Sequence, residues 1–342
     1  MAELRGVWLT NVDSDVLFVE QKLEYALGQL ADLQFNTIYP VIWNKNQTLY
    51  PSAAAKAATG IGQSENLHFD MLAMILEKAV PLGLKVIPWF EYGLMALPHS
   101  ALAKRHPDWL TMDRNGIHKT KNGMVWLNAN HQAVRTFILD LVTEIVGAYP
   151  VDGIQFDDHF GWPVELGYDN LNVSLFGSPL PQNIRDDAWM GWRAESLTQF
   201  WQAIHERFQQ IRPEALLSLS PNPHPFAYDH YLVPWPTWER LGLIGQLVVQ
   251  VYRQNTHAFS QDLMQLRSTR SRTAIGILSG LRTRSVPIEQ IRDQVEVTRR
   301  VGFAGFSFFF YETLWNLAKE PADERKAVLA ELFKEALERP DL

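Results

Sequence analysis

Cysteine is absent from the 342 residues, so the chain has neither a disulfide framework nor a thiolate metal site. No apolar run approaches the roughly 20 residues that span a bilayer. The net charge is −7, and the basic stripe that a nucleic-acid surface needs is missing. The composition, with 46% hydrophobic and 20% charged residues, instead predicts a globular protein with a large core that binds neither nucleic acid nor a membrane interior.

Several motifs are also missing. The sequence has no Gly-rich phosphate loop, no Ser-centred nucleophile elbow and no Lys at an apolar strand end, which disfavours a kinase, an esterase or a Schiff-base aldolase. The first residues, Met1–Arg5, lack the basic segment and apolar core of a secretory signal. We therefore expect a cytoplasmic location, or export if a signal segment has been removed.

Tryptophan is abundant, with 12 residues, many of them beside Pro, Gly, Asn or His as in loops. Sugar rings have apolar C–H faces that pack on indoles, so the excess indicates a carbohydrate ligand. For any single Trp the alternative is an ordinary place in the core.

Short runs rich in Val, Ile, Phe and Tyr alternate with longer amphipathic stretches, whose apolar residues follow helical spacing. The chain predicts eight such βα units in order. The strands are expected at Arg5–Thr10, Thr37–Trp43, Leu84–Phe90, Gly153–Asp157, Leu216–Ser220, Gln246–Tyr252, Thr273–Leu278 and Gly305–Phe310. The helices are expected near Val16–Leu33, Phe69–Pro81, Ala133–Ala148, Ala188–Ile211, Thr237–Leu241, Phe259–Leu266, Ile288–Val301 and Glu324–Leu337.

This rhythm predicts an α/β protein in which residues 1–342 form a single (β/α)8 TIM barrel. The later strands are nearly unbroken apolar runs, as expected when both faces of a parallel sheet are covered. The loops after strands two to five are long and rich in Trp, His, Asn and Pro, whereas connections such as residues 81–83 are short. Barrel enzymes place their chemistry on the βα side, so the long loops mark the expected active face.

The central motif is the stretch from Val151 to Phe160, which contains Asp-Gly-Ile-Gln-Phe-Asp-Asp-His. Five strand residues span about 16 Å, so Asp152 lies low in the barrel and Asp157 at its upper rim. Asp157 can act as nucleophile, general base or stabiliser of an oxocarbenium-like transition state. Because side chains alternate along a strand, we expect Asp158 to point to the other side, as a loop cap, an ion-pair partner or a second catalytic acid.

Glycoside hydrolysis needs a second carboxyl group to protonate the leaving oxygen. Glu91 follows the run Trp89-Phe90, and Glu312 follows Phe310-Tyr311. Both glutamates directly follow aromatic residues, and desolvation in such an environment raises the pKa of a carboxyl group toward the value that a general acid needs. Glu91 lies on the strand beside Asp157, and Glu312 must reach across, yet we rank Glu312 ahead; either could instead bind substrate or form a rim ion pair.

Neutral donors, acceptors and aromatic rings near strand ends suit sugar hydroxyls and sugar faces. The predicted substrate-binding residues are Trp43, Asn44, Trp89, His159, Trp162, Asn222, Gln250, Tyr252 and Tyr311. We expect no cofactor and no metal, since three consecutive residues on extended backbone, Asp157 to His159, would not converge on one ion. Arg5 is expected to be a core ion-pair partner.

Several segments together resemble a known family. They are Glu3-Leu4-Arg5-Gly6-Val7-Trp8-Leu9-Thr10, Pro40-Val41-Ile42-Trp43-Asn44, Tyr50-Pro51-Ser52, His106-Pro107-Asp108-Trp109-Leu110, Trp126-Leu127-Asn128-Ala129-Asn130, the Val151–Phe160 block and Phe308-Phe309-Phe310-Tyr311-Glu312. Across almost the whole chain they resemble the bacterial glycosyl-hydrolase-like family ten, also described as YngK-like. The resemblance implies a barrel that acts on bacterial glycans, with peptidoglycan strands the target of one branch.

The looser kinship of that family with α-amylase-like barrels implies that Asp157 is the nucleophile-like aspartate of strand four. The sequence departs from the amylase pattern at strand five, which ends Ser220-Pro221-Asn222 where an acidic Glu would stand. It also differs from the xylanase family, because strand seven ends Leu278-Ser279-Gly280-Leu281 without the required Glu. The identity of the proton donor therefore stays open.

Three hypotheses follow. The first is a glycoside hydrolase that uses Asp157 with Glu312 or Glu91 on an oligo- or polysaccharide. The second is a non-catalytic carbohydrate-binding barrel, and the third a metal-dependent barrel hydrolase or lyase. Two carboxylates within about 5–10 Å of each other would separate the first from the second.

Overall fold

The computed structural model describes residues 2–120, 122–177, 179–266 and 268–340. Its main sheet is a closed ring of parallel strands, because β1 (Leu4–Leu9) pairs with β2 (Thr37–Asn44) on one side and with β14 (Gly305–Phe309) on the other. Around the rest of the ring lie β4 (Lys85–Val86), β5 (Trp89–Phe90), β8 (Gly153–Asp157), β9 (Leu216–Ser220), β10 (Gln246–Gln250) and β11 (Thr273–Leu278). The predicted (β/α)8 barrel is confirmed.

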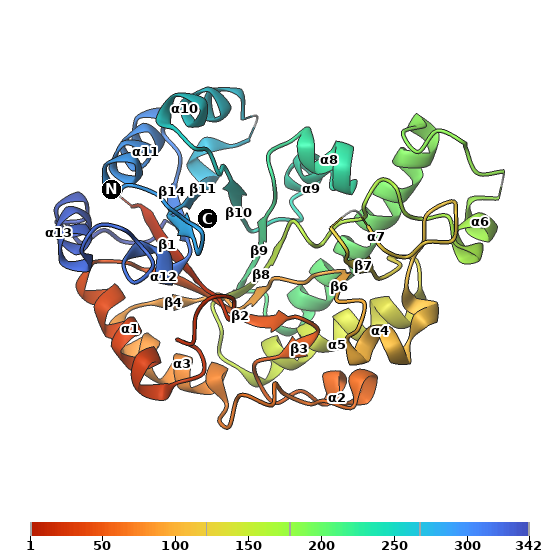
Figure 1. Cartoon of the computed structure of the whole chain (residues 1–342), viewed down its shortest axis with the longest axis horizontal. Helices are drawn as coiled ribbons and strands as arrows, with labels where there is room; N and C mark the ends of the chain where they lie inside the picture. Colours follow the sequence, from red (N-terminus) through yellow and green to blue (C-terminus); the bar gives the residue numbers. More distant parts are fainter. Residues whose placement is uncertain (1, 121, 178, 267, 341–342) are drawn as a thin grey trace.

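Helices follow the strands and cover the outside of the ring (Figure 1). They are α1 (Glu20–Asp32), α3 (Met71–Ala79), α5 (Gln132–Ala148), α7 (Asp187–Ile211), α8 (Phe226–Tyr231), α9 (Trp235–Arg240), α10 (Thr256–Gln265), α11 (Ile288–Val301) and α13 (Ala322–Leu332). The predicted helix near Val16–Leu33 begins later, at Glu20, since Val16 and Leu17 are buried in the preceding loop. The last helix ends at Leu332 rather than Leu337.

The long connections carry small elements of their own. They are β3 (Gln47–Thr48), α2 (Ala53–Thr59), β6 (Met95–Ala96), α4 (Ala101–Arg105), β7 (Val125–Trp126), α6 (Asn170–Phe176), β12 (Gly280–Leu281), β13 (Arg284–Ser285) and α12 (Tyr311–Leu314). Figure 1 shows α2, α4, α6, β6 and β7 together on the right of the view, with α10, α11 and α13 on the left. The barrel is therefore elaborated mainly on one side, after β2, β5 and β8.

The third barrel strand differs from the prediction. It was expected as one run, Leu84–Phe90, but it consists of β4 and β5 separated by Ile87 and Pro88. Proline has no backbone N–H, so it cannot donate to the ladder at that point. Asp152 holds the lower half in register, since its carboxylate accepts hydrogen bonds from Val86 N and Lys85 Nζ, both at 2.8 Å.

A bulge interrupts β2. Val41 pairs with Trp89 and Trp43 with Phe90, so two residues of β2 advance against one of β5. Tyr39 faces the barrel interior, where its ring lies 5.4 Å from that of Trp8. Trp43 would share that face under strict alternation, but its ring lies 5.5 Å from Phe137 of α5, outside the barrel. The bulge reverses the facing of the end of β2.

A layer of buried polar side chains crosses the barrel interior below its C-terminal end. The indole N–H of Trp8 donates to Gln155 (2.7 Å), the Gln155 amide donates to Ser218 (2.9 Å), and Ser218 donates to Gln246 (2.9 Å). Tyr39 donates to the same Gln246 oxygen at 3.0 Å. Buried hydrogen bonds of this kind fix side-chain orientation, so the layer is a firm floor for whatever lies above it.

Two further features bear on the sequence-based expectations. Arg5 is buried and forms an ion pair with Glu3 at 2.8 Å, as predicted for a core partner. Within the described ranges, no helix combines the length and apolar character needed to cross a bilayer.

Candidate active site

Asp157 is the last residue of β8, and its partner in the ladder is Ser220, the last residue of β9. Its side chain is only 3% exposed. Oδ2 accepts a hydrogen bond from the indole N–H of Trp89 (3.2 Å), and Oδ1 accepts one from the backbone N–H of His159 (2.9 Å). Asp157 thus lies at the C-terminal end of the barrel in a fixed orientation, where barrel enzymes carry their catalytic groups.

Glu91 directly follows β5, and its backbone N–H donates to the carbonyl of Trp43 at 3.1 Å. Oε2 accepts hydrogen bonds from the amide of Asn44 (2.7 Å) and the hydroxyl of Thr10 (3.3 Å). Burial and then the negative charge of Asp157 raise the pKa of Glu91 to about 8. Glu91 is therefore a protonated acid near neutral pH, close enough to Asp157 to feel its charge.

Asp158 does not point away from Asp157 as the sequence predicted. The strand ends at Asp157 and a turn begins, so the alternation of an extended backbone stops applying. Ligand atoms of Asp157, Asp158 and His159 all lie within 4.8 Å of one another. The expectation that the two aspartates face different sides is wrong.

Two amide groups from neighbouring strand ends bind Asp158. Asn222, after β9, donates to Oδ2 at 2.8 Å, and Gln250, the last residue of β10, donates to Oδ1 at 3.1 Å. Asp158 is partly exposed, in contrast to Asp157. Three strands thus bring a carboxylate and its two donors to one point on the barrel mouth.

His159 joins the two loops that carry the acids. Its Nδ1 lies 2.7 Å from the carbonyl oxygen of Glu91 and 3.2 Å from Oδ1 of Asp157. Since a carbonyl only accepts, Nδ1 carries the proton and donates. Burial alone would lower the pKa of His159, but the charges of Asp157 and Asp158 raise it to about 10. The imidazolium partly neutralises the acids around it.

The same convergence changes the argument about metals. The absence of a metal was predicted because Asp157, Asp158 and His159 were thought unable to meet, and the turn shows that premise to be wrong. However, the side-chain amides of Asn222 and Gln250 present N–H donors to Asp158, which suits a free carboxylate better than one shared with a cation. A metal-free site stays a prediction.

Tyr252, two residues beyond β10, completes the group. It is partly exposed, and its pKa is raised well above the usual value by burial and then by the charges of Asp158, Asp157 and Glu91. The structure therefore brings these predicted residues together. They are Glu91, Asp157, Asp158, His159, Asn44, Trp89, Asn222, Gln250 and Tyr252.

Glu312 lies elsewhere. It belongs to α12, and its carboxylate accepts hydrogen bonds from Ser14 (2.9 Å) and Asn316 (2.5 Å). It lines a hollow with residues of the β1–α1 loop and α1, including Asp15 and Tyr25. The chain turns into α12 after the strand and carries Glu312 to that loop, so the ranking of Glu312 ahead of Glu91 as the partner of Asp157 has no support in these contacts.

Three predicted sugar-binding aromatic residues do not reach the site. Trp43 is fully buried against α5, because the β2 bulge turns it outward. Trp162 is 1% exposed and belongs to the β8–α7 connection, where its ring lies next to Gly167. Tyr311 is 3% exposed and donates to Gln29 of α1 at 3.2 Å. Each occupies core space, the alternative that holds for any aromatic near a strand end.

The sequence reasoning missed Thr10 and Phe309. Thr10 binds Glu91, and the ring of Phe309 lies 6.2 Å from that of Trp89 at the same end of the barrel. Thr10 was the last residue of one expected strand and Phe309 the last but one of another, which was a signal, but acidic residues received the attention.

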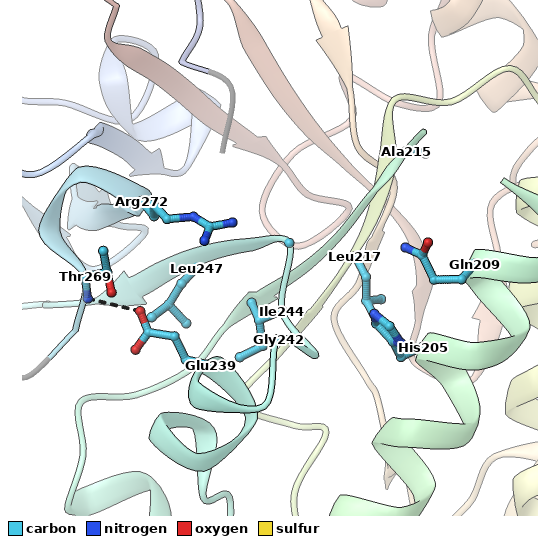
Figure 2. A pocket seen from close by; sticks show the side chains of 11 residues that line it. His205, Gln209, Ala215, Leu217, Glu239, Gly242, Ile244, Leu247, Thr269 and Arg272 are labelled. Atoms are coloured by element: carbon cyan, nitrogen blue, oxygen red, sulfur yellow. Dashed lines mark hydrogen bonds between the residues drawn. The ribbon is translucent and has the colours of Figure 1, made fainter. Parts of the chain in front are cut away.

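One pocket lies at the opposite end of the barrel (Figure 2). Its volume is about 210 Å³, and Leu217 and Leu247, near the starts of β9 and β10, form part of its floor. Glu239 there accepts a hydrogen bond from the backbone of Thr269 at 3.0 Å. This end of a barrel serves stability rather than catalysis, so the pocket is separate from the acid cluster.

Comparisons agree with this architecture. The sequence profile of the family described as "Glycosyl hydrolase-like 10" matches residues 3–297. Glycosyl hydrolase YngK of Bacillus subtilis (strain 168) is 25% identical over 243 residues, which are 64% of this chain and 45% of YngK. Glycosyl hydrolase DigH of Escherichia coli (strain K12) is 24% identical over 327 residues, 80% of this chain and 72% of DigH. The chain thus spans less than half the length of YngK.

Solved structures share the fold. The PgaB (BpsB) glycoside hydrolase domain from Bordetella bronchiseptica aligns with a TM-score of 0.71 at 13% identity, covering 96% of this chain and 99% of that domain. An α-L-fucosidase, isoenzyme 2 from Paenibacillus thiaminolyticus, also gives 0.71 at 15% identity, covering 98% of this chain and 49% of the enzyme. At these identities the likeness concerns the fold.

Proposed function

Because the chain belongs to the glycosyl hydrolase-like 10 family, we propose that it is a glycoside hydrolase whose acids at the C-terminal end of the barrel cleave a glycan. One arrangement carries the proposal: Glu91 and Asp157 stand at the ends of the neighbouring strands β5 and β8, where burial and then the charge of Asp157 raise the pKa of Glu91 to about 8. Hydrolysis of a glycosidic bond needs one carboxyl group that is protonated and one that is ionised, on either side of the bond.

Glu91 is the proposed general acid. Its Oε2 is occupied by Asn44 and Thr10, which orient the group, and its raised pKa keeps the proton available near neutral pH. In the proposed reaction Glu91 donates this proton to the oxygen of the leaving sugar as the bond to the anomeric carbon breaks.

Asp157 and Asp158 are the proposed ionised partners. Asp157 is held from below by Trp89, and Asp158 is held by two amide donors and partly exposed to an incoming substrate. Their negative charge stabilises the oxocarbenium-like transition state, and one of them attacks the anomeric carbon or activates a water there. The imidazolium of His159 limits the repulsion between the acids and opposes the rise that burial causes in the pKa of Asp157.

The glycan itself follows from the family resemblance rather than from the geometry. Glycan strands of bacterial peptidoglycan are the first substrates to test, with oligomers of N-acetylglucosamine, glucose and xylose beside them. New reducing ends and the masses of the products report cleavage. A barrel that only binds carbohydrate would retain these glycans without producing new ends.

The roles are separated by two variants. Glu91→Gln should lose about 10³-fold or more in kcat/KM on the natural glycan, and far less on an aryl glycoside whose nitrophenolate leaves without a proton. Asp157→Asn should lose activity on both substrates. Equal losses of the Glu91→Gln enzyme on both would refute its role as the acid. Activity that disappears on chelation and returns with a divalent metal would favour the metal-dependent alternative instead.

A further inference from the structure

Four aromatic rings meet at the same end of the barrel as the acids. Phe309 of β14 lies at the centre, with its ring 6.2 Å from Trp8 and 6.2 Å from Trp89 in edge contacts, and 5.7 Å from Tyr252. Only the Tyr252 contact is stacked, at an interplanar angle of 29°. Strands from three parts of the ring thus supply one aromatic cluster.

The rings differ in exposure. Trp8 and Trp89 are 1% and 2% exposed, whereas Phe309 and Tyr252 are partly exposed. The two indoles are also tied down, since Trp8 donates to Gln155 and Trp89 to Asp157. The indoles therefore form a fixed base, and Phe309 with Tyr252 forms the surface that remains free to touch a ligand.

This surface lies beside the acids. Trp89 contacts both Phe309 and Asp157, and the charges of Asp158, Asp157 and Glu91 all act on the phenol of Tyr252. The two partly exposed rings therefore border the acid cluster.

We propose that the stacked pair Phe309–Tyr252 is the platform for the sugar ring whose glycosidic bond is cleaved, and that it determines how well the enzyme stabilises the transition state. The inference rests on the proposed hydrolase function. A pyranose has an apolar C–H face that packs on such rings, and the electron-rich ring faces attract the positive charge that develops on the sugar. The platform therefore takes a pyranoside with an uncrowded apolar face.

The hydroxyl and the ring of Tyr252 have separable parts in this arrangement. The ring packs against the sugar together with Phe309, and the hydroxyl supplies a neutral donor beside three acids, where it orients a sugar hydroxyl or the ring oxygen. Loss of the hydroxyl alone should lower kcat, whereas loss of the ring should also weaken binding.

The test uses four variants of the full chain and the glycan that the wild-type enzyme cleaves. Tyr252→Phe should lower kcat about 10-fold with KM within twofold, and Tyr252→Ala should also raise KM about 10-fold. Phe309→Leu should lower kcat/KM at least 10-fold, and Phe309→Tyr, which keeps a ring, should restore most of it. Phe226→Leu is the matched control, since Phe226 is 48% exposed on α8 and contacts none of the four rings.

Folding of each variant is checked by its melting temperature, because the ring of Phe309 also packs against the buried indoles of Trp8 and Trp89. If Tyr252→Ala and Phe309→Leu fold and keep kcat/KM within threefold of wild type, the platform is refuted while the hydrolase function stands. If the wild type cleaves none of the glycans, binding of the same oligosaccharides to wild type and to Tyr252→Ala decides the matter. Weaker binding by the variant supports the platform without hydrolysis, and equal or absent binding overturns it.

Discussion

Glu91 and Glu312 have similar places in the sequence, yet the structure gives them different neighbours. Each follows an aromatic strand end, but Glu91 comes directly after β5, whereas two residues separate β14 from Glu312. Glu91 stays at the barrel mouth with Asn44 and Thr10, and α12 carries Glu312 to Ser14. Strand-end acids therefore differ in role according to how the chain leaves the strand.

The first way to sharpen this comparison is to remove each acid in turn. We expect Glu91→Gln to lower kcat/KM on the natural glycan by about 10³-fold or more, because the leaving oxygen then receives no proton. Glu312→Gln should change it less than threefold, since that carboxylate binds only Ser14 and Asn316 among the contacts described. Initial rates of the two purified variants check the prediction, and the reverse order would restore Glu312 as the acid.

The second prediction concerns pH. The general acid must keep its proton, so kcat/KM should fall above about pH 8, the pKa of Glu91. The aspartates must lose their protons, so kcat/KM should also fall below about pH 6. Burial and then the charge of Asp158 raise the pKa of Asp157 to about 6. The two limbs belong to the coupled group rather than to single residues. A pH–rate profile from pH 4 to 10 measures them. An aryl glycoside substrate should abolish the alkaline limb, and its persistence would contradict the role of Glu91.

A smaller effect is expected at Trp89. Trp89→Phe keeps most of the ring in the cluster but removes the N–H that donates to Asp157 at 3.2 Å. We expect about a 10-fold loss in kcat with the melting temperature lowered by only a few degrees. Trp43→Phe is the matched control, because the ring of Trp43 packs against Phe137 of α5 on the outside of the barrel, and its backbone carbonyl, which binds Glu91, is unchanged. Equal rate losses in both variants would indicate a general packing effect.

The smallest predicted effect is on stability. A folded-state pKa of about 8 for Glu91, above its ordinary 4.5, means that the folded protein binds more protons than the unfolded chain between these pH values. Unfolding free energy therefore falls as pH rises through that window. Glu91→Gln lacks this ionisation, so its melting temperature should exceed that of wild type by about 3 °C at pH 8 and match it near pH 4.5. A difference that is constant with pH would argue against the raised pKa.

Much of the fold was predictable because the apolar strand runs and helical spacing are local signals. The ring of strands, the height of Asp157 and the low position of Asp152 follow from strand periodicity and from counting residues. The placement of Asn222 and Gln250 on one rim also follows from their strand ends, whereas their meeting at Asp158 was not predicted.

The predictions that were wrong concern side chains at places where the regular strand backbone ends or is interrupted. Asp158 turns toward Asp157 because the strand ends one residue earlier than alternation assumes, and Trp43 faces outward because β2 contains a bulge. No Gly or Pro stands at residues 157–160, and Pro40, directly before the bulge in β2, was taken only as part of a strand. Tyr311 and Trp162 were chosen as aromatic residues near strand ends, but both are buried, and Tyr311 donates to Gln29 of α1, a helix distant in the sequence.

The bulge in β2 has a consequence for how the site could be lost. It makes Asn44, rather than Trp43, the residue that meets Glu91, so the partner of the acid depends on one surplus residue in the strand. If all residues of β2 paired regularly, Trp43 would lie opposite Glu91, which would bring an indole to the acid and send the amide of Asn44 away from it, whereas deleting Ile42 would remove the bulge and keep Asn44 in place. A one-residue slip in the pairing of β2 would therefore alter the active site while leaving every acidic residue in the sequence intact.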